Sequence, residues 1–145
     1  PSFWCKLDND NLTDFTKNMI VNNGNKVAIV AVGPMLKMAL EVSKVIKEKL
    51  NKDITIINPI NLSNLDYETL NGLKNNHQII ITLEDGELQG GYGQNIASYF
   101  GNTDIKVINY GISKKFHSDF KAEELLEECG MSVEKLGKVI EDYLQ

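Results

Sequence analysis

Short β-branched runs alternate with amphipathic stretches along most of this chain, and that alternation limits the fold more than any other feature. Residues 27–32 are continuously apolar, as in a strand buried on both faces. Gly33-Pro34 follows, with the proline placed to open a helix. Residues 35–50 then carry apolar side chains at helical spacing and charged side chains on the opposite side. A buried strand followed by an amphipathic helix is the unit from which parallel sheets are built.

The same unit is repeated toward the C-terminus. Asp66 and Ser132 stand where helix N-caps are expected, and Gly130 stands where a helix should end. The resulting order, β-α-β-α-β-α-β-α-α, predicts an α/β fold of three layers, with a parallel sheet and helices on both of its faces. The further strands are predicted at residues 54–57, 78–83 and 105–108, the further helices at residues 66–75, 93–100, 121–129 and 132–144, and an irregular segment at residues 111–120.

The chain divides into an N-terminal arm and one domain. Residues 1–25 are polar and rich in asparagine, and we interpret them as an arm or linker with a candidate edge strand at residues 18–21. Residues 26–145 are predicted to form the domain. A start at Pro1 is expected either of a processed chain or of a piece of a longer polypeptide.

Charge and cysteine content argue against several classes of function. The net charge is −5 and every basic residue is lysine, so no arginine can contact guanine and nucleic acid is not an expected partner. No apolar run approaches the ~20 residues of a membrane-spanning helix, and no signal peptide is evident. Cys5 and Cys129 are far apart in the sequence, which is typical of reduced thiols in a cytoplasmic protein.

A glycine-rich turn, Gly90-Gly91-Tyr92-Gly93, lies between a predicted strand and a predicted helix. Its free backbone N–H groups and the positive end of the helix dipole could hold an anion. The turn lacks the third glycine of a dinucleotide-binding fingerprint and follows the third strand of the domain instead of the first. Close packing is therefore the competing interpretation of these glycines.

Other candidate motifs do not assemble into a catalytic set. Asp85-Gly86 with Asn109 downstream resembles the thiamine diphosphate signature Gly-Asp-Gly and Asn-Asn, but Glu84 and Tyr110 replace two of its residues. His117-Ser118-Asp119 has the residue types of a hydrolase triad, yet neighbours in an extended chain point to alternate sides. We predict a structural role for His77 at a helix end, a solvated face for the glutamates of residues 123–128, and no catalytic, cofactor-binding or metal-ligating residue.

Four segments carry a family resemblance. They are residues 26–33 (KVAIVAVG), 58–70 (NPINLSNLDYETL), 80–93 (IITLEDGELQGGYG) and the tail at 110–136. Together they resemble the C-terminal domain of the transketolase-like thiamine enzymes. In the tail, Gly111, Phe116, Leu125, Leu126 and Gly130 fill positions seen in 1-deoxy-D-xylulose 5-phosphate synthases, and this favours the synthases over transketolases and 2-oxoacid dehydrogenase beta subunits.

The resemblance implies a mostly parallel sheet of about five strands with one antiparallel edge strand. Residues 18–21 are the candidate for that strand. The Asn23-Gly24 turn would pair it directly with residues 27–32, although another place on the sheet edge stays open.

The resemblance also implies a function for a parent enzyme. Such enzymes use thiamine diphosphate and magnesium to join pyruvate to glyceraldehyde 3-phosphate, and two preceding domains hold the cofactor. This chain is then expected to bind no cofactor, to be inactive alone, and to support the fold and a homodimer. Its expected partners are the N-terminal thiamine-binding domains, fused or separate, with no membrane contact.

Two loops are the candidate functional segments. The first is an anion or interface loop that contains Glu84, Asp85, Gly90, Gly91 and Gly93. The second is an active-site-entrance loop with Lys114, Lys115, His117 and Asp119, where the family usually reads Asp-Arg-Phe-Ile-x-His-Gly. Two alternatives are a C-terminal domain or subunit of a transketolase or 2-oxoacid dehydrogenase, and a stand-alone module that binds a small ligand. A third is a scaffold that provides a dimer or domain interface.

Overall fold

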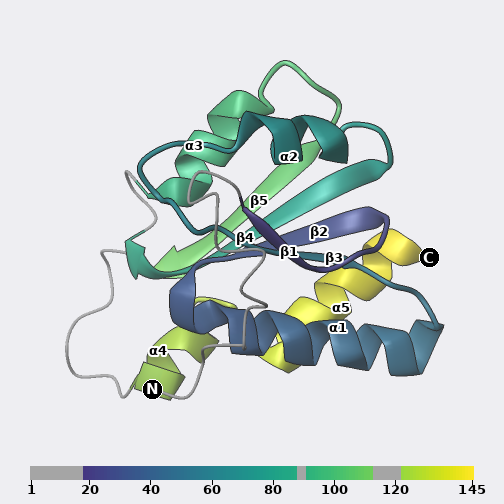
Figure 1. Cartoon of the computed structure of the whole chain (residues 1–145). Helices are drawn as coiled ribbons and strands as arrows, with labels where there is room; N and C mark the ends of the chain where they lie inside the picture. Colours follow the sequence, from purple (N-terminus) through teal and green to yellow (C-terminus); the bar gives the residue numbers. More distant parts are fainter. Residues whose placement is uncertain (1–17, 88–90, 113–121) are drawn as a thin grey trace, which may run out of the picture.

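Five strands form a single mixed sheet in the order β1-β3-β2-β4-β5 (Figure 1). A computed structural model describes residues 18–87, 91–112 and 122–145. The strands are β1 (Met19–Asn22), β2 (Lys26–Ala31), β3 (Thr55–Asn58), β4 (His77–Glu87) and β5 (Lys106–Ile112).

The sheet is parallel apart from its first strand. β2 runs parallel to both of its neighbours, with Ile29 opposite Ile56 on β3 and Ile81 on β4. β5 continues the parallel arrangement beyond β4, and β1 pairs antiparallel with β3 at the other edge. The predicted α/β fold with one antiparallel edge strand is confirmed.

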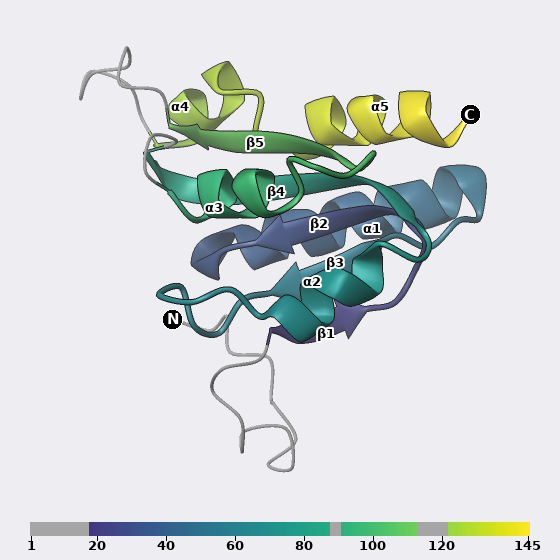
Figure 2. The same cartoon turned by 90° about the horizontal axis from the view of Figure 1, so that it is seen from above.

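Helices cover both faces of the sheet, as Figures 1 and 2 show. One face carries α1 (Leu36–Leu50), α4 (Ala122–Glu128) and α5 (Val133–Leu144), and a short 3-10 helix, η2 (Gly33–Met35), leads into α1. The opposite face carries α2 (Tyr67–Leu73) and α3 (Tyr92–Tyr99). No helix within the described ranges is both long and apolar enough to cross a lipid bilayer.

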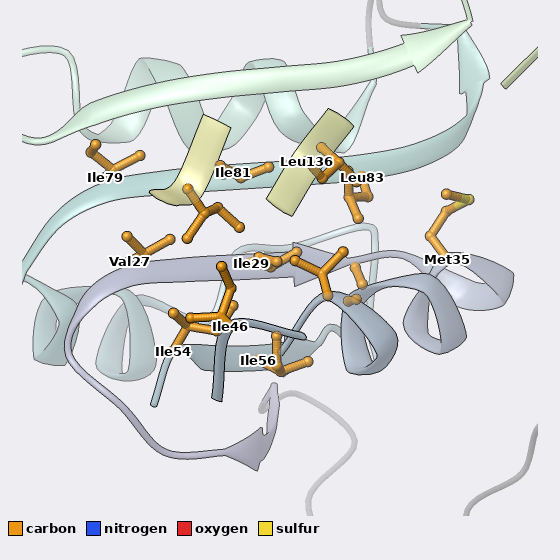
Figure 3. Packing of buried hydrophobic residues seen from close by; sticks show 14 of the residues in the cluster. Val27, Ile29, Met35, Ile46, Ile54, Ile56, Ile79, Ile81, Leu83 and Leu136 are labelled. Atoms are coloured by element: carbon orange, nitrogen blue, oxygen red, sulfur yellow. The ribbon is translucent and has the colours of Figure 1, made fainter. Parts of the chain in front are cut away.

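Each strand contributes alternate side chains to two separate cores, because successive residues of a strand point to opposite faces. On β4, Ile79, Ile81 and Leu83 pack toward α1 and α5, in the cluster of Figure 3. Ile80 packs toward α2 and α3 with Phe100. The central strands therefore carry mostly apolar, often β-branched side chains on both faces, as the sequence pattern predicts.

The edge strand is present, but the predicted hairpin with β2 is wrong. β1 pairs with β3, which lies between β1 and β2 (Figure 2). The Asn-Gly segment crosses the start of β3 instead of folding back on itself. There the Gly24 N–H donates to Thr55 Oγ1 at 3.1 Å, and the Asn25 N–H donates to the Asp53 carbonyl at 3.3 Å. These long-range bonds outweigh the local turn preference.

The helix caps agree with the prediction, whereas two strands are longer than expected. Asp66 accepts a hydrogen bond from the Thr69 N–H, Ser132 accepts one from the Lys135 N–H, and Gly130 has the positive φ of a helix C-terminus. β4 extends to Glu87, and β5 continues to Ile112 in a segment predicted to be irregular. The register between them shifts after Leu83, so the last pair is Glu87 with Ile112.

Candidate functional site

The N-terminus of α3 is occupied by a carboxylate of the protein itself. Glu84 lies at the C-terminal part of β4 and is 8% exposed. Its Oε1 accepts a hydrogen bond from the Tyr92 N–H at 2.7 Å, and its Oε2 accepts one from the Gly93 N–H at 3.0 Å. These are the donors that an external anion would need. Of the predicted anion loop, Gly90 lies outside the described residues and Gly91 is the N-cap of α3.

Gly93 is glycine because α3 starts directly against the sheet. A Cβ at this position would lie 2.4 Å from Thr82 Oγ1 and 2.8 Å from Asn109 Oδ1. These two side chains are hydrogen-bonded to each other across β4 and β5, with Thr82 Oγ1 donating to Asn109 Oδ1 at 2.6 Å. The geometry supports the close-packing interpretation of this glycine.

Asp85 and Asn109 lie on opposite faces of the sheet. Asn109 bonds Thr82 on the α3 face. Asp85 is exposed and lines a cavity of about 560 Å³ on the other face, together with Met35 and Leu125. The two side chains therefore do not meet, and no group of three or more potential metal ligands gathers within the described parts of the chain.

A buried polar cluster connects α3 to α2 and β1, and sequence reasoning missed it. Tyr92 is 5% exposed and Asn18 is 8% exposed. Burial raises the pKa of the Tyr92 hydroxyl, the neighbouring Asn18 side chain lowers it, and Asp66 and Glu84 raise it further. Asp66 Oδ2 also accepts the Asn18 N–H at 2.7 Å, which attaches the start of β1 to the N-terminus of α2. In the amino-acid sequence, the N-cap pattern at Asp66 is the one feature that points to this cluster.

His77 has the structural place expected of it, but its partner was not foreseen. Its Nε2 shares a hydrogen bond with Thr55 Oγ1 at 2.7 Å, and the imidazole is 8% exposed. Thr55 also accepts the Gly24 N–H, so this histidine supports the crossing between β1 and β2. Burial lowers the pKa of His77, and the backbone of Leu73 partly offsets that shift.

The depressed pKa of His77 predicts a specific pH dependence of stability. The unfolded chain takes up the proton near pH 6.5, whereas the folded chain takes it up only at lower pH. The free energy of unfolding should therefore fall as the pH drops below about 6.5 and through the folded pKa. In a His77→Gln variant this part of the loss should disappear. Urea titrations of both proteins at pH 7.5 and 5.5 measure the free energy of unfolding. Because the carboxylates titrate alike in both proteins, the difference between the two losses reports on His77. Equal losses in the two proteins would contradict the prediction.

The remaining candidate residues divide into two groups. Lys114, Lys115, His117 and Asp119 of the predicted entrance loop, and the His117-Ser118-Asp119 motif, lie outside the described residues. On α4, Glu124 and Glu128 are exposed, and Glu127 forms an ion pair with Lys135 at 3.2 Å. These α4 side chains have the solvated character that the acidic pattern predicts.

The sequence profile of the transketolase C-terminal domain matches residues 16–136. The chain belongs to the transketolase C-terminal domain family. This transketolase C-terminal domain is 32% identical over 83% of its length to the 1-deoxy-D-xylulose-5-phosphate synthase of Clostridium tetani. It is also 32% identical over 88% of its length to the synthase of Vibrio parahaemolyticus. In each case the chain spans about 20% of the relative.

Two solved structures share the fold. One is a split-gene transketolase described as an inactive beta4 tetramer, with a TM-score of 0.81, 22% identity, and coverage of 95% of this chain and 45% of that one. The other is the R525L mutant of a Pichia stipitis transketolase, with a TM-score of 0.60, 13% identity, and coverage of 88% of this chain and 18% of that one. Both likenesses concern the fold of this transketolase C-terminal domain.

The described residues of the domain do not fit the thiamine diphosphate that the family resemblance implies. A diphosphate at the α3 N-terminus would have to displace Glu84 from the Tyr92 and Gly93 N–H groups. The resemblance to the metal-binding signature does not help, because Asp85 and Asn109 lie on opposite faces of the sheet. Within the described part of this segment, Glu84 caps α3 and Gly93 packs against Thr82 and Asn109.

Proposed function

We propose that this chain is the C-terminal, non-catalytic supporting domain of a 1-deoxy-D-xylulose 5-phosphate synthase-like transferase. The parent enzyme would convert pyruvate and glyceraldehyde 3-phosphate to 1-deoxy-D-xylulose 5-phosphate and carbon dioxide. The observation that carries the proposal is the 32% identity to two such synthases over more than four fifths of the chain. A cytoplasmic location stays a prediction from the two separated cysteines.

Thiamine diphosphate and magnesium would be held by the preceding domains of the parent enzyme. The internal bonds of Glu84 support this division of labour, because they use the donors that the glycine-rich turn could otherwise offer. The catalytic domains would be fused to this one or carried by a separate chain. The likeness to a split-gene transketolase concerns the fold, so both arrangements and the homodimer stay predictions.

The proposal is tested with the complete enzyme and with this chain alone. The complete enzyme, given pyruvate and glyceraldehyde 3-phosphate, should release carbon dioxide and form 1-deoxy-D-xylulose 5-phosphate, as detected by mass spectrometry. This chain alone should form no product and give no heat of binding with thiamine diphosphate and Mg²⁺. Micromolar binding by the isolated chain would overturn the supporting role. Ketol transfer between sugar phosphates by the complete enzyme would favour the transketolase alternative.

A further inference from the structure

A groove runs between α3 and the loop that leads into α2, two elements that lie on the same face of the sheet (Figure 1). Its volume is about 410 Å³. Tyr67 and Tyr99 contribute their rings, whose centroids lie 5.3 Å apart, and Leu65, Ser63 and Asn95 complete much of the lining. We refer to it as the Tyr67–Tyr99 groove.

The chemistry of this groove is that of the centre of a protein interface. None of the described residues that line the groove is charged, although charged residues make up 24% of the chain. Tyr67 is 57% exposed, and Leu62, in the loop that leads into α2, is 50% exposed. Interface centres are depleted in charge and enriched in tyrosine, whose ring supplies area and whose hydroxyl supplies a hydrogen bond. A large tyrosine and leucine surface left in water is therefore typical of a docking site.

The position at which the chain enters the fold indicates the occupant. Asn18 is held at the N-terminus of α2 by the 2.7 Å bond from its N–H to Asp66 Oδ2. Asp66 directly precedes Tyr67, so polypeptide arriving from the N-terminal side reaches the domain beside this groove. About four fifths of each curated relative lies outside the part that this chain spans.

We propose that the Tyr67–Tyr99 groove docks the thiamine-binding domain that precedes this one in the parent enzyme. The inference rests on the proposed function, since it takes its partner from there. Where the thiamine-binding domain is fused to this chain, its polypeptide joins the fold at Asn18, and that tether gives it a high effective concentration beside the groove, so a groove of modest size suffices to hold it. The described lining residues themselves are uncharged, but Lys74 Nζ lies 4.8 Å from the centroid of the Tyr99 ring, so the docked surface has to leave that ammonium solvated or paired.

Photo-crosslinking in the complete enzyme tests the proposal. Tyr67→p-benzoylphenylalanine places a photoreactive ketone in the groove, and Ser98→p-benzoylphenylalanine, at an exposed groove residue of α3, is a second probe. The control is Tyr143→p-benzoylphenylalanine, because Tyr143 is an exposed tyrosine, 37% accessible, on α5 across the sheet. After irradiation, mass spectrometry locates the crosslinked peptides.

Both groove probes should crosslink to the thiamine-binding domain at least ten times more than the Tyr143 control does. Crosslinks to another copy of this domain, equal yields at groove and control positions, or no crosslink from either groove probe would overturn the docking proposal. The activity of the unmodified complete enzyme is measured separately. An active synthase without groove crosslinks therefore refutes the docking site alone, whereas an enzyme that forms no 1-deoxy-D-xylulose 5-phosphate refutes the proposed function.

Discussion

Replacing Gly24 with alanine should lower the free energy of unfolding by about 3 kcal/mol or more. A Cβ at this position would lie 2.3 Å from the Asp53 carbonyl oxygen, 2.5 Å from its carbon and 2.6 Å from the Ile54 carbonyl carbon. All three atoms belong to the backbone at the start of β3, so no side chain can rotate to relieve the clash. The crossing from β1 to β2 would have to move away from β3. Urea unfolding followed by circular dichroism measures the loss.

Gly72→Ala is the matched control for that variant. Gly72 lies in α2, and a Cβ there would meet no atom within 4 Å. Alanine has a higher helix propensity than glycine and restricts the unfolded chain more. The free energy of unfolding of this variant should therefore rise by about 0.5–1 kcal/mol. A Gly24→Ala protein as stable as the unmodified chain would show that the segment between β1 and β2 does not pass the start of β3 as closely as described.

Removing the carboxylate of Glu84 should have the second large effect on stability. Glu84→Ala leaves the buried Tyr92 and Gly93 N–H groups without their acceptor at the start of α3. We expect the free energy of unfolding to fall by about 3 kcal/mol, because buried unpaired donors are costly and hydrogen bonds to a carboxylate are stronger than those to a neutral acceptor. Glu84→Gln keeps one oxygen acceptor and should lose about half as much. Asp85→Ala, at the exposed neighbour, should change stability by less than about 0.5 kcal/mol.

The same variants test whether the turn can take an external anion. Added phosphate or acetate should raise the melting temperature of Glu84→Ala, because its α3 N-terminus is open to an anion. The unmodified protein should not respond, because Glu84 already bonds the two donors. Stabilisation of the unmodified protein, with amide shifts at Gly91 and Gly93, would favour the ligand-binding module instead.

Features that depend on neighbouring residues could be predicted from the sequence. The predictions of a strand at residues 27–32 and of a helix at residues 35–50 both depend on the spacing of apolar residues. β2 and α1 lie where that spacing places them. The caps at Asp66 and Ser132 depend on one side chain reaching a backbone N–H three residues later, which is a short-range pattern.

Features that depend on distant residues could not be predicted. The Asn-Gly turn signal is local, but Gly24 and Asn25 bond Thr55 and Asp53, at and just before the start of β3 and about thirty positions away. Likewise, Glu84 looks like a departure from a glycine in a cofactor motif, and only its position beside α3 shows that it is a helix cap. The cluster of Tyr92, Asn18 and Asp66 brings together three elements whose spacing in the sequence carries no periodic signal.

The insertion of β3 between β1 and β2 affects the order in which this domain can be assembled. Within this domain β1 is the first strand in chain order, yet Met19 can pair only once Asn58 is present. β2 and β3, joined by α1, pair over a shorter separation in the sequence than β1 and β3 do. We therefore expect β1 to join the sheet after β2 and β3 have paired, because its only partner strand among the described residues is β3.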